Sequence, residues 1–374
     1  MRPITVVQLL PALESGGVER STLEIAEALV TAGHRAIVVS AGGRLLPQLL
    51  ALGGEHVTLD IGRKSPLTLS RVLPLRRLLQ RGDIDIVHVR SRLPAWIARF
   101  ALVGINPARR PRLVSTVHGL NSPSRYSAVM VVGERVICVS QSVRDYVMAH
   151  YPASDARRLR VIPRGIDPSA FPPAPLPDPA ARAWAEAQHP ALAGDGPLLL
   201  LPGRGTRLKG HADAVELLVG LRADGRDARL WLPGAREPGR EAYIAELEAM
   251  AAKRGVGDAI AFTAPTDAIA RAYAASDLVL QLSRKPEAFG RTVIEALSVG
   301  RPVLGWAHGG VGELLSRLQP QAAVPPFDVS LLHERALALL DRGSTTAGTM
   351  PDLSDFTLHA MQQATLDVYA ELIN

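Results

Sequence analysis

Short apolar runs alternate with amphipathic runs along the whole chain, and no other feature limits the fold as strongly. Repeats of this kind are typical of β-α units and a parallel sheet. Residues 21–31 predict a helix, because their apolar side chains share one face and Gly33 follows them. The apolar runs that predict strands in the first half are 4–10, 36–40, 86–89, 113–117, 135–139 and 159–162.

A proline-rich segment, residues 171–179, interrupts this pattern and predicts a linker, since it suits neither a helix nor a central strand. A second alternating series follows it. Its predicted strands are 198–201, 229–232, 260–263, 278–282 and 302–305, and its predicted helices are 210–223, 240–254, 267–275 and 290–299. We therefore expect a domain over 1–172, a second over 173–350, and a last helix within 351–374 that packs toward the first domain.

The predicted fold class is α/β, with two Rossmann-like, doubly wound domains facing each other across a cleft. Ligands of such sheets bind outside the carboxyl ends of the strands, so the cleft is the expected site. No G-x-G-x-x-G segment follows the first apolar run, which argues against a nicotinamide or flavin enzyme.

Composition excludes several classes of protein. One cysteine, Cys138, allows neither an intrachain disulfide framework nor a multi-cysteine metal cluster. The apolar start of the chain is short and resembles a buried strand more than a signal peptide, and no apolar run is long enough to span a bilayer. We expect a cytoplasmic protein, with peripheral contact to the inner membrane left open.

The charge is divided unevenly between the halves. Residues 1–172 hold 23 Lys and Arg against 12 Asp and Glu, a net +11, whereas residues 173–374 hold 19 against 24, a net −5. A basic first half suits an anionic partner such as a phosphorylated glycan or anionic lipid. A solvated surface in an arginine-rich protein explains the same numbers. Nucleic acid ranks last among the partners, because it rests on charge alone.

Two loops are suited to bind phosphate. Gly16 and Gly17 precede the first predicted helix, where unpaired N–H groups can hold an anion, although a plain tight turn has the same pattern. In the second half, Arg204 and Lys209 bracket a small loop that runs from a strand into a helix. Two cations beside a helix N-terminus can neutralise a diphosphate as it leaves, although a basic surface turn also fits.

The segment 287–295 is the most specific. Gly290 is expected to open a helix there, so that backbone N–H groups near Phe289 and Thr292 can bind sugar hydroxyls or phosphate. Glu287 precedes this helix and Glu295 lies just over one turn inside it. Ionised carboxylates accept several hydrogen bonds, so this pair can hold hydroxyls on two sugars.

His118 ends a predicted strand of the first half. A lone histidine is more often structural than catalytic, but strand ends line the expected cleft.

These segments together resemble the retaining glycosyltransferases of family 4, which have the GT-B fold. The resemblance extends over most of the chain. The segments 90–96, 161–167 and 300–315 look closest to bacterial lipopolysaccharide core glycosyltransferases. Relatives often carry Asn where this chain has Arg164, which leaves the role of that loop open.

The resemblance implies a role for each matching residue. Arg204 and Lys209 would bind the donor diphosphate, Glu295 the nucleotide ribose, and Glu287 the donor sugar, which His118 would also contact. The other donor-binding residues would be Gly17, Phe289, Gly290, Arg291 and Thr292. From the basic first half we expect an acceptor site with Glu19, Arg20, Arg90 and Arg92.

The implied reaction retains the anomeric configuration, with His118, Glu287, Arg204 and Lys209 as the catalytic residues and without a metal or other cofactor. The expected donor is UDP-glucose, with GDP-mannose next, and the acceptor is a lipopolysaccharide core or other envelope glycan. Alternatives are a GT-B sugar-nucleotide epimerase, a glycogen-synthase-like enzyme, and a non-enzymatic nucleotide- or membrane-binding module.

Overall fold

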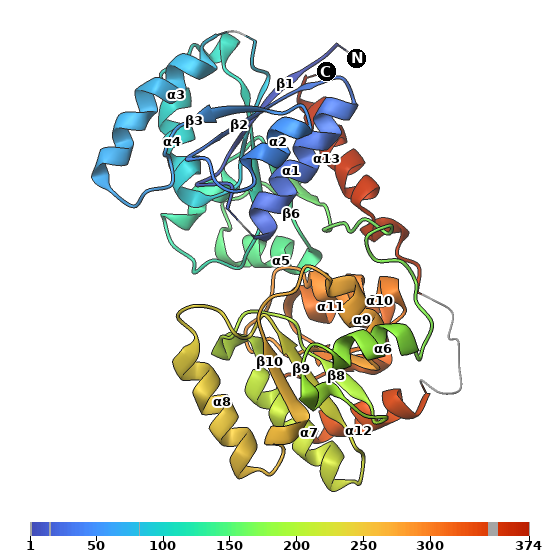
Figure 1. The fold of residues 1–374 in the computed structure, drawn as a ribbon. Helices are drawn as coiled ribbons and strands as arrows, with labels where there is room; N and C mark the ends of the chain where they lie inside the picture. Colours follow the sequence, from blue (N-terminus) through green and yellow to red (C-terminus); the bar gives the residue numbers. More distant parts are fainter. Residues whose placement is uncertain (1, 15, 82, 343–350, 374) are drawn as a thin grey trace. The chain divides into compact units, whose positions relative to one another are not determined.

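The computed structural model describes residues 2–14, 16–81, 83–342 and 351–373. It divides into two compact units, the first made of Met1–Gly165 with Leu358–Asn374 and the second of Ile166–Thr357 (Figure 1). The first unit therefore ends at Gly165 rather than at residue 172, and the last helix belongs to it. The end of the predicted second domain, 343–350, lies outside the described residues.

The first unit is built around a parallel sheet with the strand order β3-β2-β1-β4-β5-β6-β7 among its described residues. The central strands are buried on both faces, as the apolar runs predict. The strands are β1 (Thr5–Leu9), β2 (Arg35–Ser40), β3 (Glu55–Thr58), β4 (Ile86–Val89), β5 (Arg112–Val117), β6 (Arg135–Cys138) and β7 (Leu159–Val161).

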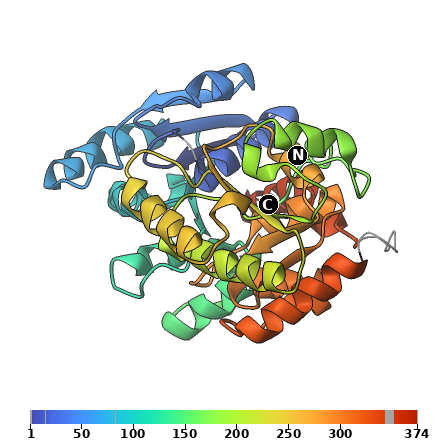
Figure 2. The same ribbon diagram turned by 60° about the horizontal axis from the view of Figure 1, so that its bottom comes forward.

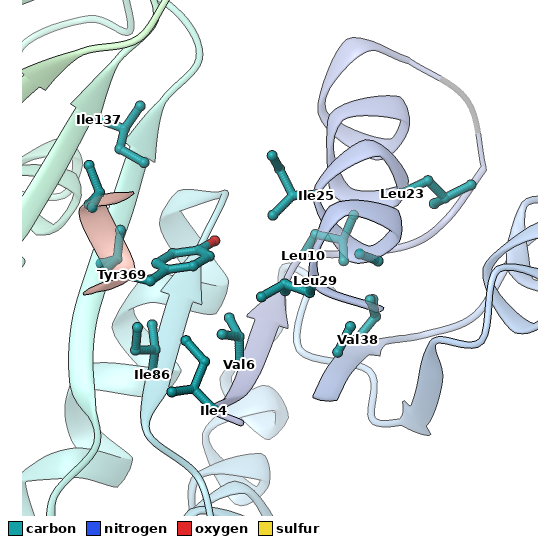
Figure 3. Packing of buried hydrophobic residues seen from close by; sticks show 14 of the residues in the cluster. Ile4, Val6, Leu10, Leu23, Ile25, Leu29, Val38, Ile86, Ile137 and Tyr369 are labelled. Atoms are coloured by element: carbon teal, nitrogen blue, oxygen red, sulfur yellow. The ribbon is translucent and has the colours of Figure 1, made fainter. Parts of the chain in front are cut away.

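Helices cover this sheet, and the first of them starts earlier than predicted, at Gly17 instead of residue 21. The helices are α1 (Gly17–Thr31), α2 (Leu46–Ala51), α3 (Val72–Leu79), α4 (Arg92–Val103), α5 (Gln141–His150) and α13 (Leu358–Ile373). Helix α13 packs beside α1 (Figure 1). Tyr369 of α13 lies over the sheet beside Ile4, Val6 and Ile86, and Leu29 of α1 completes this core (Figure 3).

The second unit repeats the arrangement, with the order β10-β9-β8-β11-β12-β13 among its described residues. Its strands are β8 (Leu198–Leu200), β9 (Arg229–Pro233), β10 (Ile260–Thr263), β11 (Leu278–Gln281), β12 (Val303–Trp306) and β13 (Ala323–Val324). Its helices are α6 (Pro179–Glu186), α7 (His211–Ala223), α8 (Glu241–Lys253), α9 (Ile269–Ala275), α10 (Arg291–Val299), α11 (Gly309–Leu318) and α12 (Val329–Arg342). In Figure 2, yellow-green α7 lies beside gold α8 and orange-red α12.

Both sheets reverse their strand order at one point, between β1 and β4 in the first unit and between β8 and β11 in the second. Crevices at the carboxyl ends of the strands on either side of such a point bind ligands in doubly wound folds. The loops after these four strands are therefore the expected ligand-binding loops of each unit.

The proline-rich segment is not a linker, so that prediction is wrong. The buried Arg301 side chain donates hydrogen bonds to the carbonyls of Ala174 and Pro175, and Ser298 donates to the carbonyl of Phe171. These bonds satisfy backbone carbonyls that proline-rich chain cannot pair with itself. The segment is thereby packed onto the second unit, and the division between units falls at Gly165 and Ile166.

The thiol of Cys138 is buried at the end of β6, and burial raises its pKa to about 12. A thiol with so high a pKa is a poor nucleophile at neutral pH.

Among the described residues, no helix is long and apolar enough to cross a membrane.

Candidate active site

The loop after β8 carries Arg204 and Lys209 and is shaped by glycines. Gly210 has φ +78°, and a Cβ added there would lie 2.0 Å from the carbonyl oxygen of Leu282. Only glycine lets α7 begin so close to the end of β11. The Lys209 chain passes over Gly203, with its Cδ 3.5 Å from the position that a Cβ would take. Arg204 is exposed at the tip of the loop.

Lys209 contacts Glu287 directly. Its Nζ lies 2.6 Å from Oε1 of Glu287, and both side chains are about a quarter to a third exposed. The hydroxyl of Ser283 donates to the same carboxylate oxygen, and the amide of Gln281 lies 3.5 Å from the other. The loops after β8 and β11 thus bring a cation and a carboxylate together at the point where the sheet reverses.

The backbone after β11 is held by the start of α11. The N–H of Gly310 donates to the carbonyl of Glu287 at 2.8 Å, and a Cβ on Gly309 would lie 2.5 Å from that oxygen. His308 lies just before Gly309, and its Nε2 donates to the carbonyl of Ser283 at 2.7 Å. No role was predicted for Ser283, His308 or these glycines from the sequence, although His-Gly-Gly at the start of a helix could have indicated a close backbone approach.

Helix α10 begins where predicted. Gly290 precedes it with φ +105°, and a Cβ there would lie 2.7 Å from a methyl of Val311. Arg291 and Thr292 form its first turn and are half-buried, whereas Phe289 is buried against Phe356. Because Phe289 packs into the unit, its backbone rather than its ring is available to a ligand.

Glu295 is anchored rather than solvated. The hydroxyl of Tyr273, on α9, donates to Oε2 of Glu295 at 2.9 Å. Burial and the adjacent carboxylate hold the pKa of Tyr273 well above its usual value, so the phenol stays protonated and continues to donate. Tyr273 is a residue that the sequence analysis missed, since a buried tyrosine in an apolar helix carries no local sign of its partner.

The first unit has a cavity of about 350 Å³ at the carboxyl ends of β1, β4 and β5. Arg90, Arg92 and His118 line it, together with Lys64 and Tyr126. Among the described residues that line it, none is acidic, so its lining is positively charged. Sequence reasoning placed Arg90, Arg92 and His118 at strand ends, but it did not find Lys64 or Tyr126.

Arg90 is buried, although it is one of the residues that line the cavity. It is 3% exposed, and its guanidinium donates to Oε1 of Gln8 at 2.8 Å and to the hydroxyl of Ser21 at 3.2 Å. Its Nη2 is buried and has no hydrogen-bond partner within the described residues. Arg92, in contrast, is half-buried, and its guanidinium lies over the ring of Tyr126 at 5.4 Å from the ring centroid.

At the start of α1, Val18 lines this cavity, whereas Gly17, Glu19 and Arg20 are not among its lining residues. Gly17 is exposed, and a Cβ added there would meet no atom within 4 Å. Arg20 lines a different cavity of about 280 Å³, beside Glu24 and Arg44. The carboxylate of Glu19 folds back over Gly16, where a negative charge favours the helix N-terminus. Arg20 and Arg92 therefore line different cavities, and their grouping in one acceptor site stays a prediction.

His118 lies directly after β5, and its Nδ1 contacts the guanidinium of Arg164. Burial, followed by the charges of Arg164 and Arg90, holds the pKa of His118 well below its usual value. His88 lies behind it on β4, between the hydroxyls of Tyr369 and Thr116 at 2.7 Å each. These contacts fix a buried polar cluster under the floor of the cavity.

A metal site does not emerge from these groups. Among the described residues, no cluster of three or more His, Cys, Asp or Glu side chains could hold an ion.

Comparison with known proteins identifies the family. Residues 15–170 match the family model Glycosyltransferase Family 4, and residues 183–347 match Glycosyl transferases group 1. A D-inositol 3-phosphate glycosyltransferase of Xylanimonas cellulosilytica is 29% identical over 78% of this chain and 67% of its own length. A second one, from Jonesia denitrificans, is 32% identical over 46% of this chain and only 41% of its own length.

Solved structures agree on the fold. A glycosyltransferase of Rickettsia africae has a TM-score of 0.85 and 26% identity, and the match covers 100% of each chain. Anabaena HepE in complex with UDP and glucose has a TM-score of 0.78 and 18% identity, over 98% of this chain and 100% of its own. WaaG, a glycosyltransferase involved in lipopolysaccharide biosynthesis, has a TM-score of 0.65, 19% identity and coverage of 98% and 97%.

The two family models together account for both units, and the folds of these units are those of the matched structures. This chain belongs to family 4 of the glycosyltransferases and has the GT-B fold.

Proposed function

We propose that this glycosyltransferase moves a hexose from a nucleotide-diphosphate sugar to an anionic envelope glycan, with retention of the anomeric configuration. The observation that carries the proposal is the group of Lys209, Glu287 and Glu295 at the reversal point of the second sheet. Cations there suit a diphosphate, and the two carboxylates suit hydroxyls. UDP-glucose is the favoured donor, because HepE, which shares the fold, binds UDP and glucose. GDP-mannose comes next.

Each residue has one role in this proposal. Arg204 and Lys209 bind the diphosphate, and Glu295 binds the ribose hydroxyls from inside α10. Glu287 and the backbone N–H groups at Gly290, Arg291 and Thr292 bind the donor sugar. Lys209 is paired with Glu287, so contacts of these two side chains to phosphate and sugar compete with that ion pair.

The bond that breaks joins the anomeric carbon to the leaving phosphate, on which negative charge then grows. Arg204, Lys209 and the N-terminus of α10 stabilise that charge electrostatically. The leaving phosphate, as the charge on it increases, takes the proton of the attacking hydroxyl. No metal is required in this scheme, since two cations and a helix terminus do the same work.

We therefore expect transfer from UDP-glucose to continue in excess EDTA, because protein cations rather than Mg²⁺ neutralise the leaving group. Release of UDP, measured with and without candidate acceptors, checks this and also separates the alternatives. An epimerase consumes UDP-glucose without an acceptor, and a non-enzymatic module releases no UDP at all. Activity that disappears in EDTA and returns with Mg²⁺ or Mn²⁺ would contradict the metal-free scheme.

The cavity of the first unit supports an anionic acceptor. Lys64, Arg90 and Arg92 line it, and the planar guanidinium binds phosphate through two parallel hydrogen bonds. The curated relative from Xylanimonas is named for D-inositol 3-phosphate, a phosphorylated compound. A phosphorylated lipopolysaccharide core or a related envelope glycan fits the same lining, and WaaG shares the fold.

The double variant Lys64→Gln/Arg92→Gln should raise the KM of an anionic acceptor by roughly 10–100-fold, the scale of losing one or two charge-assisted hydrogen bonds. The KM of UDP-glucose should change little. The acceptor KM of the native enzyme should also rise with salt, which screens charges. Arg110→Gln is the matched control, because Arg110 is exposed and lies before β5, at the opposite end of the sheet. Equal rises of the acceptor KM in both variants would mean that the positive charge of the first unit is general surface composition and not an acceptor site.

A second surface of the first unit supports peripheral contact with an anionic membrane. The segment Pro66–Arg71 and helices α3 and α4 expose apolar side chains, with Leu67 at 80% and Val103 at 74%. Phe100 and Arg99 lie on the same outer face of α4 as Val103. Residues 61–133 hold 13 Lys and Arg against two Asp. Exposed apolar groups among cations are typical of surfaces that lie in the headgroup region of a bilayer.

Flotation with phosphatidylglycerol vesicles should recover the native protein, and pure phosphatidylcholine should recover much less. Replacing Arg77 and Arg99 with Gln should weaken binding by roughly 30-fold, at about 1 kcal/mol per cation near the surface. The same two substitutions at Arg226 and Lys253, exposed on the second unit, are the control. Equal recovery of both variants, or of the native protein on both lipids, would remove the membrane from the proposal.

A further inference from the structure

Arg164 occupies the position where the family resemblance leads one to expect Asn, and its contacts define a role. It follows β7, and one Nη donates to the hydroxyl of Ser21 on α1 at 2.6 Å. The other Nη contacts Nδ1 of His118. Ser21 also accepts from Arg90, so the Arg164 side chain is fixed between α1 and the end of β5.

The contact determines the tautomer of His118. A guanidinium has only donors, so Nδ1 must present its lone pair to Arg164. The single proton of a neutral imidazole then sits on Nε2. An imidazolium would point an N–H at the guanidinium, and that arrangement is repulsive. His118 is one of the residues that line the cavity of the first unit, and its Nε2 is buried and has no hydrogen-bond partner within the described residues.

We infer that Arg164 is a positioning residue that holds His118 as a neutral imidazole with its proton on Nε2, which leaves Nε2 as a hydrogen-bond donor at the cavity of the first unit. That this donor serves the transfer reaction rests on the proposed function. His118 cannot then act as a general base, because its one lone pair is occupied by Arg164. This agrees with a scheme in which the leaving phosphate takes the proton.

The charged and titratable groups that face His118 support the neutral form. They are Arg164 after β7, His88 on β4, and Arg90 directly after β4. Two cations near the ring oppose a third positive charge, so loss of Arg164 should allow His118 to protonate at a higher pH.

Nitrogen NMR of the protein labelled at histidine tests the tautomer without any substrate. The His118→Asn variant identifies the His118 signals. The native protein should show a protonated Nε2 and an unprotonated Nδ1, unchanged well below pH 6.5. Arg164→Met removes both donor and charge, so its His118 should lose the single tautomer and titrate at higher pH. Arg164→Gln keeps a donor amide and should preserve the tautomer.

The kcat of each Arg164 variant should parallel the tautomer that its His118 adopts. Arg164→Met should lower kcat by roughly 10–100-fold, the scale of losing a group that orients an active-site histidine. The fall in kcat of this variant should become larger at lower pH, because the imidazolium form of His118 accumulates. Its affinity for UDP, measured by calorimetry, should stay the same. Arg164→Gln should recover most of kcat.

A native spectrum with the proton on Nδ1 would overturn the inference, and so would an Arg164→Met variant with native tautomer and pH profile. Should Arg164→Met fail to fold, the native and Arg164→Gln spectra still decide. Failure to transfer sugar from any nucleotide donor would instead contradict the proposed function and leave the spectral result standing.

Discussion

Alanine at Lys209 or at Arg204 is expected to lower kcat/KM by roughly 10²–10³, the scale of losing one donor to a transition-state charge. Lys209 lies 2.6 Å from Glu287, and this ion pair holds its side chain in the site. Both partners are partly exposed, and such pairs contribute at most about 1 kcal/mol to stability. Thermal unfolding should therefore change little in either variant while turnover collapses.

Arg207→Ala provides the matched control for this prediction. Arg207 is a cation of the same loop, two residues from Lys209, but it is paired with Glu246 and lies over the ring of Tyr243. Its loss should leave kcat/KM within about a factor of three, since exposed ion pairs contribute little. Near-native turnover in Lys209→Ala, or an equal loss in Arg207→Ala, would show that loop charge in general, not these two cations, matters.

Much of the fold could be predicted from the sequence, because apolar runs report burial directly. The strands at β4 and β10 have the predicted bounds, and helix α10 begins one residue after Gly290. Strand β3 was missed because Glu55–Thr58 lies at the sheet edge and is only partly buried, so it needs no apolar run. Strand β13 consists of two residues and leaves no pattern to find.

The site could be predicted only as far as strand ends reveal it. Arg90 follows a strand as expected, but its direction is set by Gln8 and Ser21, which come from other elements. The partners Tyr273 and Glu295 are 22 residues apart, and His118 and Arg164 are 46 apart. Contacts over such separations depend on how helices and strands pack, and no local spacing in one sequence encodes them.

The two carboxylates of the second unit should differ in what they bind. Glu295→Gln is expected to weaken binding of UDP itself by roughly 10–100-fold, because it loses charge-assisted bonds to the ribose hydroxyls. Glu287→Gln should spare UDP or even improve its binding, since Lys209 loses its carboxylate partner and becomes available to the diphosphate. The same variant should weaken UDP-glucose by a similar 10–100-fold, because contacts to the sugar are lost.

Calorimetric titration of the native protein and these two variants with UDP and with UDP-glucose tests the central claim, that the second unit holds a sugar nucleotide with the nucleotide at Glu295 and the sugar at Glu287. The account predicts a loss for both ligands in Glu295→Gln and a loss for UDP-glucose alone in Glu287→Gln. Binding of neither ligand to the native protein, or equal losses for both ligands in both variants, would contradict it.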